Sequence, residues 1–476
     1  MAGETEFSKS FEVNKARLDE LLQVERSFDL LYRVVTIGGK KACFYFIDGF
    51  CKDEIMEKIL EFLYKITPEE MPGTAHDFLK NKLPYGEIDL IKTEADFVQR
   101  MLSGIPMLMV DGYTECLALD FRTYPARSVD EPEKDKVMRG SRDGFVETVV
   151  FNTALIRRRI RSRDLVMEMH TVGASSKTDV VMAFVDGRVE PRMLDEIRSR
   201  IDEIDVDALT MNQQSLAECL YPHKWYNPFP KFKFSERPDV TAASLLEGSI
   251  AIMVDNSPSA MILPTSVFDI VEDADDYYFP PVTGTYLRLT RVFINLLAVF
   301  MTPLFLLLIN NPQWIPQSLA FIKIDDTINV PIYLQMLILE LTVDGLKLAS
   351  VNTPNMLSTP LSVVAGIILG DYTVSSGWFN SEIMLYMAFV AVANYTQVSL
   401  ELGYALKFMR IILLLLTAAL DVWGFVLGVA FVIVCIVRNK TISGKSYIYP
   451  LIPFNAKQFL RRFFRISLPR VSRKSN

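Results

Sequence analysis

Residues 44–63 read FYFIDGFCKDEIMEKILEFL, and residues 182–201 read MAFVDGRVEPRMLDEIRSRI. The two segments align with Asp48-Gly49 on Asp186-Gly187. Each has a short apolar run, an Asp-Gly pair and a stretch with apolar residues at helical spacing. Asp-Gly is typical of turns because glycine adopts a positive φ without steric cost. Both segments therefore predict a buried strand, a tight turn and an amphipathic helix.

A second pair of segments repeats in the same order. GIPMLMVDGYTECLALDFRTYP (104–125) aligns with GSIAIMVDNSPSAMILPTSVFD (248–269). Asp111-Gly112 falls on Asp255-Asn256, and both pairs suit the turn of a β-hairpin. The first pair of segments is offset by 138 residues and the second by 144, so the second copy carries a small insertion. The repeat predicts two related α/β subdomains, at 26–130 and 170–285.

Between the two copies lies RGSRDGFVETVVFNTALIRRRIR (139–161), which contains six arginines. We expect Asp143 to cap a helix whose buried face is formed by Phe145, Val149, Asn152, Ile156 and Ile160. One interpretation is an anion site at the glycine turn with Arg139 and Arg142. The other is a connector helix whose arginines pair with acidic neighbours or with a second subunit. The acidity of the surrounding domain favours the connector.

The charge is unevenly distributed along the chain. Residues 1–285 hold 34 Lys and Arg against 49 Asp and Glu, whereas residues 286–476 hold 16 against 8. Residues 438–476 hold ten basic side chains and no acidic one. An acidic front domain repels nucleic acid, so we expect no nucleic acid among the partners.

Two long apolar runs lie in the second half, at 292–309 and 411–437. A spanning helix needs about 20 apolar residues, so each predicts one membrane span. The charged N-terminus lacks the apolar core of a signal peptide, so the front domain is expected in the cytoplasm. The expected organisation is an N-terminal tail (1–25), subdomain 1 (26–130), a connector with the arginine-rich helix (131–169), subdomain 2 (170–285), a transmembrane domain (286–437) and a basic cytosolic tail (438–476).

Signals of catalysis are weak. The five cysteines are scattered, the three histidines lie far apart, and SGKS (443–446) lacks the first glycine of a phosphate-binding loop. The sequence therefore predicts no enzyme, no cofactor, no catalytic residue and no metal site.

These motifs resemble the A-subunit family of bacterial spore germinant receptors (the GerA family), and within it the stage V sporulation branch. The resemblance rests on the arginine block and on SKTDV (176–180), IDVDALT (204–210), YNPFP (226–230), ERPDV (236–240), VDNSPSAMILPT (254–265) and YPLIPFN (449–455). It implies a multi-pass protein of the spore inner membrane with a cytosolic domain of two subdomains. It also implies an oligomeric ion channel in germination that amplifies ion release with a small membrane partner and other germination membrane proteins.

The family motif supplies one set of candidate site residues, expected to form a structural connector and subunit contact: Arg139, Gly140, Arg142, Asp143, Gly144, Glu147, Asn152, Arg157, Arg158 and Arg159. The membrane half supplies a second set. Glu340, Asp344 and Lys347 share one helical face, which either lines an ion path or lies flat in the interface. Val364, Ile367 and Ile368 lie in a glycine-bounded run and are expected to form a narrow apolar wall of the path.

Basic residues flank both ends of the apolar half, so both termini are expected in the cytoplasm with an even number of crossings, four by our count. Lys407 and Arg410 also favour the cytoplasmic side, which conflicts with a single crossing at 411–437. A re-entrant or interfacial piece would resolve this conflict. The predicted function is an oligomeric channel that releases monovalent ions during germination. A nutrient receptor A subunit, a membrane-anchored scaffold and a transporter component remain as alternatives.

Overall fold

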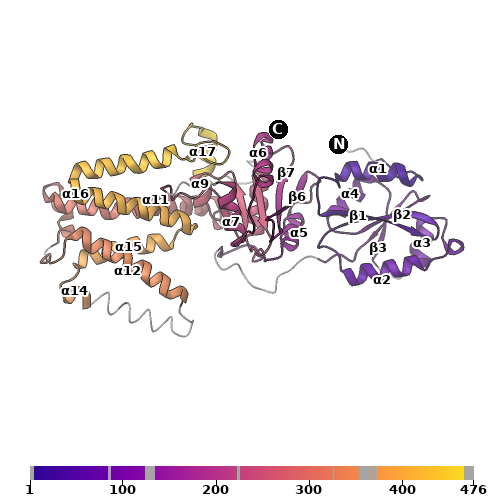
Figure 1. Cartoon of the computed structure of the whole chain (residues 1–476), viewed down its shortest axis with the longest axis horizontal. Helices are drawn as coiled ribbons and strands as arrows, with labels where there is room; N and C mark the ends of the chain where they lie inside the picture. Colours follow the sequence, from indigo (N-terminus) through magenta and orange to yellow (C-terminus); the bar gives the residue numbers. More distant parts are fainter. Residues whose placement is uncertain are drawn as a thin grey trace. The chain divides into compact units, whose positions relative to one another are not determined.

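The computed structural model describes residues 5–83, 87–123, 135–221, 226–324, 326–352, 366 and 372–465. The chain forms two compact units. The first comprises Met1–Pro222 and Phe232–Pro264 and contains two β-sheets; the second comprises His223–Lys231 and Thr265–Asn476 and is helical (Figure 1). This arrangement confirms the predicted fold class, two related α/β subdomains followed by a helical region.

The first sheet has five strands in the order β1-β2-β4-β5-β3, and each of its pairings is antiparallel. Its elements are α1 (Phe11–Leu22), β1 (Leu30–Ile37), β2 (Lys40–Ile47), α2 (Asp53–Tyr64), η1 (Pro68–Glu70), α3 (Ala75–Lys82), β3 (Ile88–Ile91), α4 (Glu94–Leu102), β4 (Met107–Val110) and β5 (Cys116–Leu119). The predicted turn after β2 is confirmed, because Gly49 has a φ of 75°.

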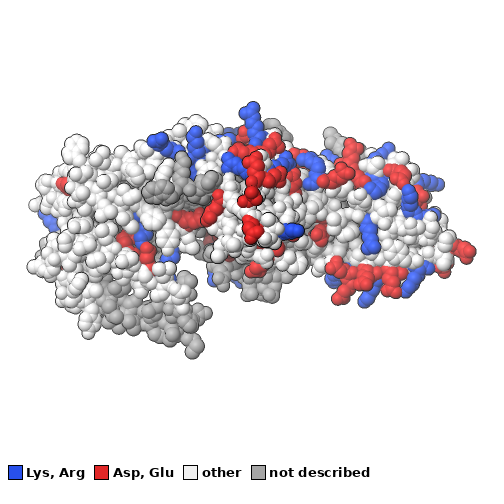
Figure 2. Space-filling model, viewed as in Figure 1, with Lys and Arg blue, Asp and Glu red and all other residues white. Residues whose placement is uncertain are grey.

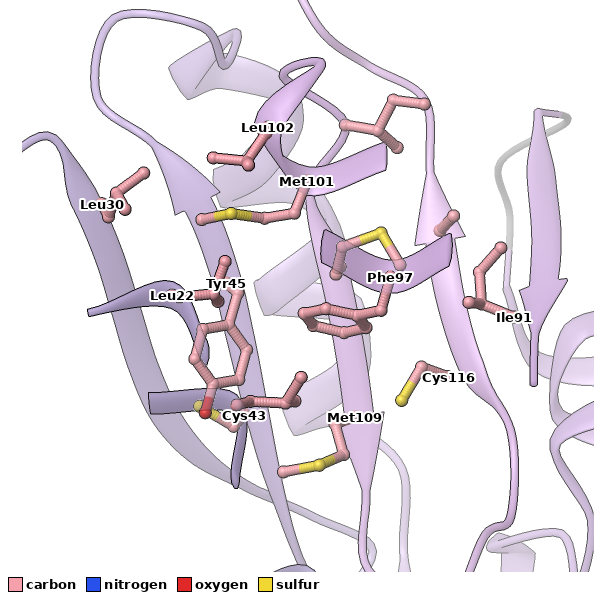
Figure 3. Close-up of a cluster of buried hydrophobic side chains, with 14 of the residues drawn as sticks. Leu22, Leu30, Cys43, Tyr45, Ile91, Phe97, Met101, Leu102, Met109 and Cys116 are labelled. Carbon is pink, nitrogen blue, oxygen red and sulfur yellow. The ribbon is translucent and has the colours of Figure 1, made fainter. Parts of the chain in front are cut away.

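Helices cover both faces of this sheet. Alternate side chains of a strand point to opposite faces, and the central strands therefore supply two separate apolar cores. On one face Tyr45 of β2 meets Phe97 of α4 edge-on, with ring centroids 5.6 Å apart, and Leu22 of α1 lies in the same cluster (Figure 3). On the other face Phe44 packs with residues of α2 and α3.

Residues 1–25, expected to be a tail, contain a structural helix. Phe11, Leu18 and Leu22 of α1 are buried in the core of the first sheet. Full burial of one such side chain contributes roughly 1.5–3 kcal/mol. The expectation of a tail was wrong because half of the residues in this helix are polar, and only its narrow apolar face contacts the sheet.

The second sheet has the same topology, with strand order β6-β7-β9-β10-β8 and antiparallel pairings. Its elements are α5 (Val149–Arg159), β6 (Leu165–Val172), β7 (Thr178–Val185), α6 (Pro191–Asp202), α7 (Asn212–Leu220), β8 (Lys233–Ser235), α8 (Pro238–Leu246), β9 (Ile250–Val254) and β10 (Ala260–Leu263). The predicted turns at Gly187 and Asn256 are present, with φ of 74° and 61°. The expected boundary between residues 169 and 170 falls inside β6.

The arginine-rich helix α5 is the first helix of the second repeat and the counterpart of α1. The N–H at the start of α1, on Phe11, donates to Asp111 over 3.1 Å, and the N–H of Val149 donates to Asp255 over 3.1 Å. Asn14 and Asn152 each bond both backbone groups of the residue six positions earlier. The repeat therefore begins with a helix, and α5 is part of a subdomain rather than a connector between two.

Helix α5 begins later than the sequence predicts. Its N-cap residue is Thr148, and the carboxylate of Asp143 accepts hydrogen bonds from Arg159 instead of capping the helix. The predicted buried set of Phe145, Val149, Asn152, Ile156 and Ile160 is confirmed, since each is at most 3% exposed. Phe145 and Ile160 reach the same core from outside the helix.

The helical unit contains α9 (Val267–Val271), α10 (Asp275–Tyr278), α11 (Pro281–Asn310), η2 (Pro312–Trp314), η3 (Gln317–Ile322), α12 (Ile332–Asn352), α14 (Thr373–Ser375), α15 (Ser381–Tyr395), α16 (Leu400–Arg438) and α17 (Ala456–Phe463). The expected boundary at 285/286 falls inside α11. Among the described residues, α11 and α16 are long and apolar enough to cross a membrane. Figure 2 shows few charged side chains over most of this unit, in contrast to the sheets.

Helix α16 is a hairpin of two helical legs. Asp421 interrupts it with φ 47° and ψ −122°. A Cβ on Gly424 would lie 1.8 Å from the carbonyl oxygen of Leu416, and one on Gly428 would lie 2.3 Å from Leu413. The legs 400–420 and 422–438 therefore run antiparallel in close contact. The single helix expected at 411–437 is therefore two legs, and the sequence does not reveal the bend because the apolar run continues through it.

The hairpin defines two ends of the helical unit, which we call the tip and the base. At the tip, Asn311 donates to both carboxylate oxygens of Asp421, over 3.1 and 3.0 Å. At the base, Arg288 near the start of α11 donates to the carbonyl of Arg461 in α17, over 3.1 Å. Asn439, directly after α16, accepts from Asn227, over 3.1 Å. The start of α11 and the end of α16 therefore both lie at the base.

Helices α12 and α15 also run between the tip and the base. Met336 packs near Leu414, while Lys347 stacks 4.9 Å from the ring of Tyr404, so α12 runs antiparallel to the first leg of α16. Helix α15 runs antiparallel to α11, because Phe305 stacks on Tyr386 with centroids 4.2 Å apart and residues 396–399 share a small pocket with Arg291 and Asn295. The described residues therefore traverse the helical unit five times.

Candidate functional site

Four charged side chains meet inside the helical unit, and we call them the charge quartet: Glu340 and Asp344 of α12, and Lys407 and Arg410 of α16. Arg410 binds Glu340 with two hydrogen bonds, from Nε over 2.6 Å and from Nη2 over 2.9 Å. The ammonium of Lys407 lies 3.4 Å from Glu340 Oε2 and also donates to Asp344. Two carboxylates and two cations make the quartet formally neutral.

Helical spacing positions these four side chains. Glu340 and Asp344 are one turn apart on α12, and Lys407 and Arg410 are one turn apart on the first leg of α16. Because the helices are antiparallel, the carboxylate pair faces the cation pair. Arg410 also donates to the carbonyl of Ala298 in α11, so the quartet joins three helices.

Burial differs within the quartet. Arg410 is 0% exposed, Glu340 4% and Lys407 6%. The side chain of Asp344 is 31% exposed. An isolated charge costs about 2.5–3.5 kcal/mol at the centre of a membrane helix on insertion scales, and mutual pairing offsets this cost. Asp344 is the member whose carboxylate is most accessible to an ion.

The structure thus brings Glu340 and Asp344 together, but each already contacts a cation. Lys407 and Arg410 both lie against α12, where they pair with Glu340 and Asp344. The signal that could have found this pairing is complementary spacing, with two acids one turn apart and two bases one turn apart on separate apolar helices. Val364, Ile367 and Ile368 lie outside the described residues.

A second ionic cluster lies at the base. Arg288 donates to Glu272 over 2.7 Å, and Arg291 binds Asp273 over 3.1 Å and contacts Asp276. Burial raises the pKa of Asp276 and opposes the lowering effect of Arg291 and Arg288. These pairs link the start of α11 to α10 and to the segment before it.

In the first unit, Arg157 is the buried centre of the arginine block. Its side chain is 0% exposed and binds Asp29 through Nε over 2.7 Å and through Nη2 over 2.9 Å. It also donates to the hydroxyl of Ser27 and to the carbonyls of Ser162 and Leu165. Ser27 and Asp29 directly precede β1, so this arginine of the second repeat holds the first repeat.

The other residues of the block have separate positions. Arg159 binds Asp143 over 2.8 Å, and Asn152 is buried against the backbone of Val146. Gly140 has a φ of 136°, a conformation that favours glycine. Gly144 is buried, whereas the exposed members of the block are Arg139, Gly140, Arg142, Glu147 and Arg158. The block is therefore not one site: its centre is structural and its exposed residues are dispersed.

Comparison with known proteins identifies the family. The family model described as Bacillus/Clostridium GerA spore germination protein matches residues 17–476. The chain belongs to the GerA family. Stage V sporulation protein AF of Bacillus subtilis (strain 168) is 35% identical over 444 residues, which cover 93% of this chain and 90% of that protein. Spore germination protein KA of the same organism is 25% identical over 453 residues, covering 93% and 82%.

A solved structure also matches this GerA-family chain. The crystal structure of the N-terminal domain of the A subunit of the Bacillus megaterium spore germinant receptor GerK3 is 24% identical, with a TM-score of 0.41. The match covers 55% of this chain and 96% of that one. By the family model and the two relatives, the GerA-family chain is a spore germination protein similar to germinant receptor A subunits, and its two long apolar helices indicate association with a membrane.

Proposed function

We propose that this GerA-family protein is a multi-pass subunit of the spore inner membrane that assembles into an oligomer and conducts monovalent ions during germination. A small membrane protein and other germination membrane proteins are its proposed partners. The observation that carries the proposal is the charge quartet, buried among helices whose other surfaces are apolar. Ionisable groups at such depth usually mark an ion pathway or a conformational element that controls one.

Within the quartet, Asp344 and Glu340 have different roles in this proposal. Arg410 occupies both oxygens of Glu340, so Glu340 positions the helices and keeps Arg410 neutralised. Asp344 is partly exposed and contacts only the flexible end of Lys407 among the quartet cations, so its carboxylate faces the ion path. Val364, Ile367 and Ile368 form the proposed apolar wall, where a narrow constriction gates by dewetting.

The orientation follows from the charges at the base. Arg288, Arg291 and Arg438 lie there, together with the basic residues after α16. Basic residues are retained on the cytoplasmic side of membrane proteins, so the base is cytosolic and the tip faces the other side. Because α11 starts and α16 ends at the base, the number of crossings is even.

Ion flux in reconstituted vesicles tests the proposal. We expect Asp344→Asn to change the rate or the cation preference of flux while the protein assembles normally. Val364→Ala and Ile367→Ala widen the wall and should leak monovalent ions without a stimulus. Glu340→Gln leaves Arg410 buried with one neutral partner, so we expect a loss of folded protein as well as altered flux.

The control is Lys58→Gln, which changes an exposed charge on α2 of the sheet unit, outside the helical unit. Unchanged flux and selectivity in Asp344→Asn, Val364→Ala and Ile367→Ala, with normal assembly, would place the ion path elsewhere. The helical unit would then act as an anchor for the sheet domains.

A further inference from the structure

The base carries an exposed apolar surface in the segment between α16 and α17 and on α17 itself. Leu451, Ile452 and Phe454 are 39%, 49% and 68% exposed, and Pro453 between them is exposed too. Leu460 on the neighbouring helix α17 is 50% exposed, and Phe464, directly after that helix, is 44% exposed. We call this set, 451–454 with Leu460 and Phe464, the base rim.

The base rim is held in place by specific contacts. Asn455 donates from its backbone to Pro450 over 3.0 Å and caps α17 through its side chain, over 3.1 Å. Behind the exposed residues, Phe454, Phe459, Phe463 and Phe268 form a chain of ring contacts with centroids 5.9, 4.5 and 5.3 Å apart. The exposure therefore belongs to an ordered segment.

Hydrogen bonds and an ion pair fasten α17 to the start of α11 and to the segment before α10. Arg288 donates to the carbonyls of Arg461 and Arg462 at the C-terminal end of α17, over 3.1 Å each. Arg462 in turn binds Glu272 over 2.8 Å. The base rim therefore lies at the end of the helical unit where α11 begins and α16 ends. In the proposed membrane placement, the helices leave the hydrocarbon layer at this level.

The charges within the segment that carries the base rim are of one sign, and the neighbouring acids Asp269 and Glu272 are paired with Arg462. Lys457 and Arg461 lie on α17 beside Leu460 and Phe464, and Arg465 follows. Residues 439–465 contain no Asp or Glu. A surface that mixes exposed aromatic and aliphatic side chains with lysine and arginine is typical of segments that lie in the interface of an anionic membrane. Self-association through this surface would bring like charges together.

We infer that the base rim inserts into the interfacial layer of the cytosolic leaflet and binds anionic phospholipid headgroups through Lys457 and Arg461. This inference rests on the proposed membrane placement of α11 and α16. Leu451, Ile452, Phe454, Leu460 and Phe464 enter the boundary between headgroups and acyl chains. The hydrogen bonds between α17 and Arg288 of α11 would then depend on the charge of the lipid surface.

The test uses the full-length chain in vesicles, with its five cysteines replaced by alanine and one new cysteine labelled with an environment-sensitive fluorophore. We expect Phe454→Cys and Leu460→Cys probes to be quenched by lipids that carry a quencher just below the headgroup. A probe at Met211→Cys, which is 73% exposed in the sheet unit, should not be quenched.

Lipid charge provides the second readout. Vesicles containing phosphatidylglycerol should show stronger quenching than pure phosphatidylcholine, and Arg461→Gln should reduce insertion about fivefold in equilibrium terms. Unquenched probes at 454 and 460 would overturn the inference, and so would a cross-link between two copies at 454, which would assign the rim to a subunit contact.

A probe at Leu296→Cys separates this inference from the proposed function. Leu296 lies in α11 and is 53% exposed. Deep quenching at 296 without quenching at 454 rejects the base rim alone. No quenching at 296 rejects the membrane placement itself.

Discussion

Arg157 illustrates how one side chain joins two copies of a fold. Its guanidinium makes a two-point contact with Asp29, a residue 128 positions away in the sequence, and further contacts with Ser27 and two carbonyls. A planar guanidinium suits this arrangement because its donors are fixed in direction. The sequence predicted that the arginines pair with acidic neighbours. It could not identify Asp29, because nothing local distinguishes that residue among the carboxylates of the domain.

Replacing Arg157 therefore has a large expected effect. Arg157→Ala leaves the Asp29 carboxylate buried without its cation, which costs about 3–5 kcal/mol of unfolding free energy. Arg157→Lys should lower the unfolding free energy by a smaller amount, because an ammonium keeps the charge but cannot make the two-point contact. Urea unfolding of residues 1–264 measures both. A loss below about 1 kcal/mol for Arg157→Ala, the level of a surface pair, would contradict the assignment.

Arg26→Ala is the matched control. Arg26 also pairs with an acid of the second repeat, Asp186, over 2.8 Å, but both side chains are 44% exposed. The hydrogen bond from Arg26 lowers the pKa of Asp186. The pair therefore contributes at neutral pH, and its contribution is lost as the pH falls through that lowered pKa. Solvent screening keeps it small, so we expect a change of about 0–1 kcal/mol.

At the scale of the elements, α16 shows what hydropathy can and cannot predict. The apolar run at 411–437 was recognised, and so was the single charge at Asp421. The bend was not predictable from these, because a charge alone does not reverse a helix. Gly424 and Gly428, four residues apart, are the stronger signal, since small residues at this spacing let two helices approach closely.

The hairpin makes a specific prediction about membrane sidedness. A straight helix from 400 to 438 would place its two ends on opposite faces of the membrane, whereas the hairpin places both at the base. We expect Ser399→Cys and Lys440→Cys to react with a membrane-impermeant thiol reagent from the same side of sealed vesicles, in a chain otherwise free of cysteine. Cysteine at Gln313, after α11, should react from the other side. Opposite sidedness of 399 and 440 would refute the hairpin in the membrane.

At the scale of the molecule, the duplicated architecture was predictable and its starting point was not. The strand, turn and helix segments repeat with recognisable residues, including both Asp-Gly turns. The leading helices α1 and α5 share few residues, because their exposed faces differ in charge and length. Asn14 and Asn152 are the shared feature that could have revealed them, since each bonds the backbone six residues earlier.

Truncation tests the importance of the leading helix. We expect residues 1–264 to form a soluble, cooperatively folding domain with both helix and strand by circular dichroism. Residues 26–264 lack Phe11, Leu18 and Leu22, whose burial contributes roughly 1.5–3 kcal/mol each. This shorter fragment should melt at much lower temperature or aggregate. Equal stability of the two fragments would show that residues 1–25 are a tail after all.

The Ser27-Asp29 pair that accepts hydrogen bonds from Arg157 has a counterpart in the second repeat, where Ser162 donates to Asp164 over 3.0 Å. The two acidic residues are equivalent, because the N–H of Asp48 bonds the carbonyl of Asp29 and the N–H of Asp186 bonds that of Asp164. Asp164 is 54% exposed, so it could in principle accept an arginine from a second molecule. The residue of α1 equivalent to Arg157, however, is Asp19. Stacking a second molecule onto this end in the same way would place one carboxylate against another. The Arg157–Asp29 type of contact therefore joins two repeats and cannot be extended to a third. Any larger assembly has to use different surfaces.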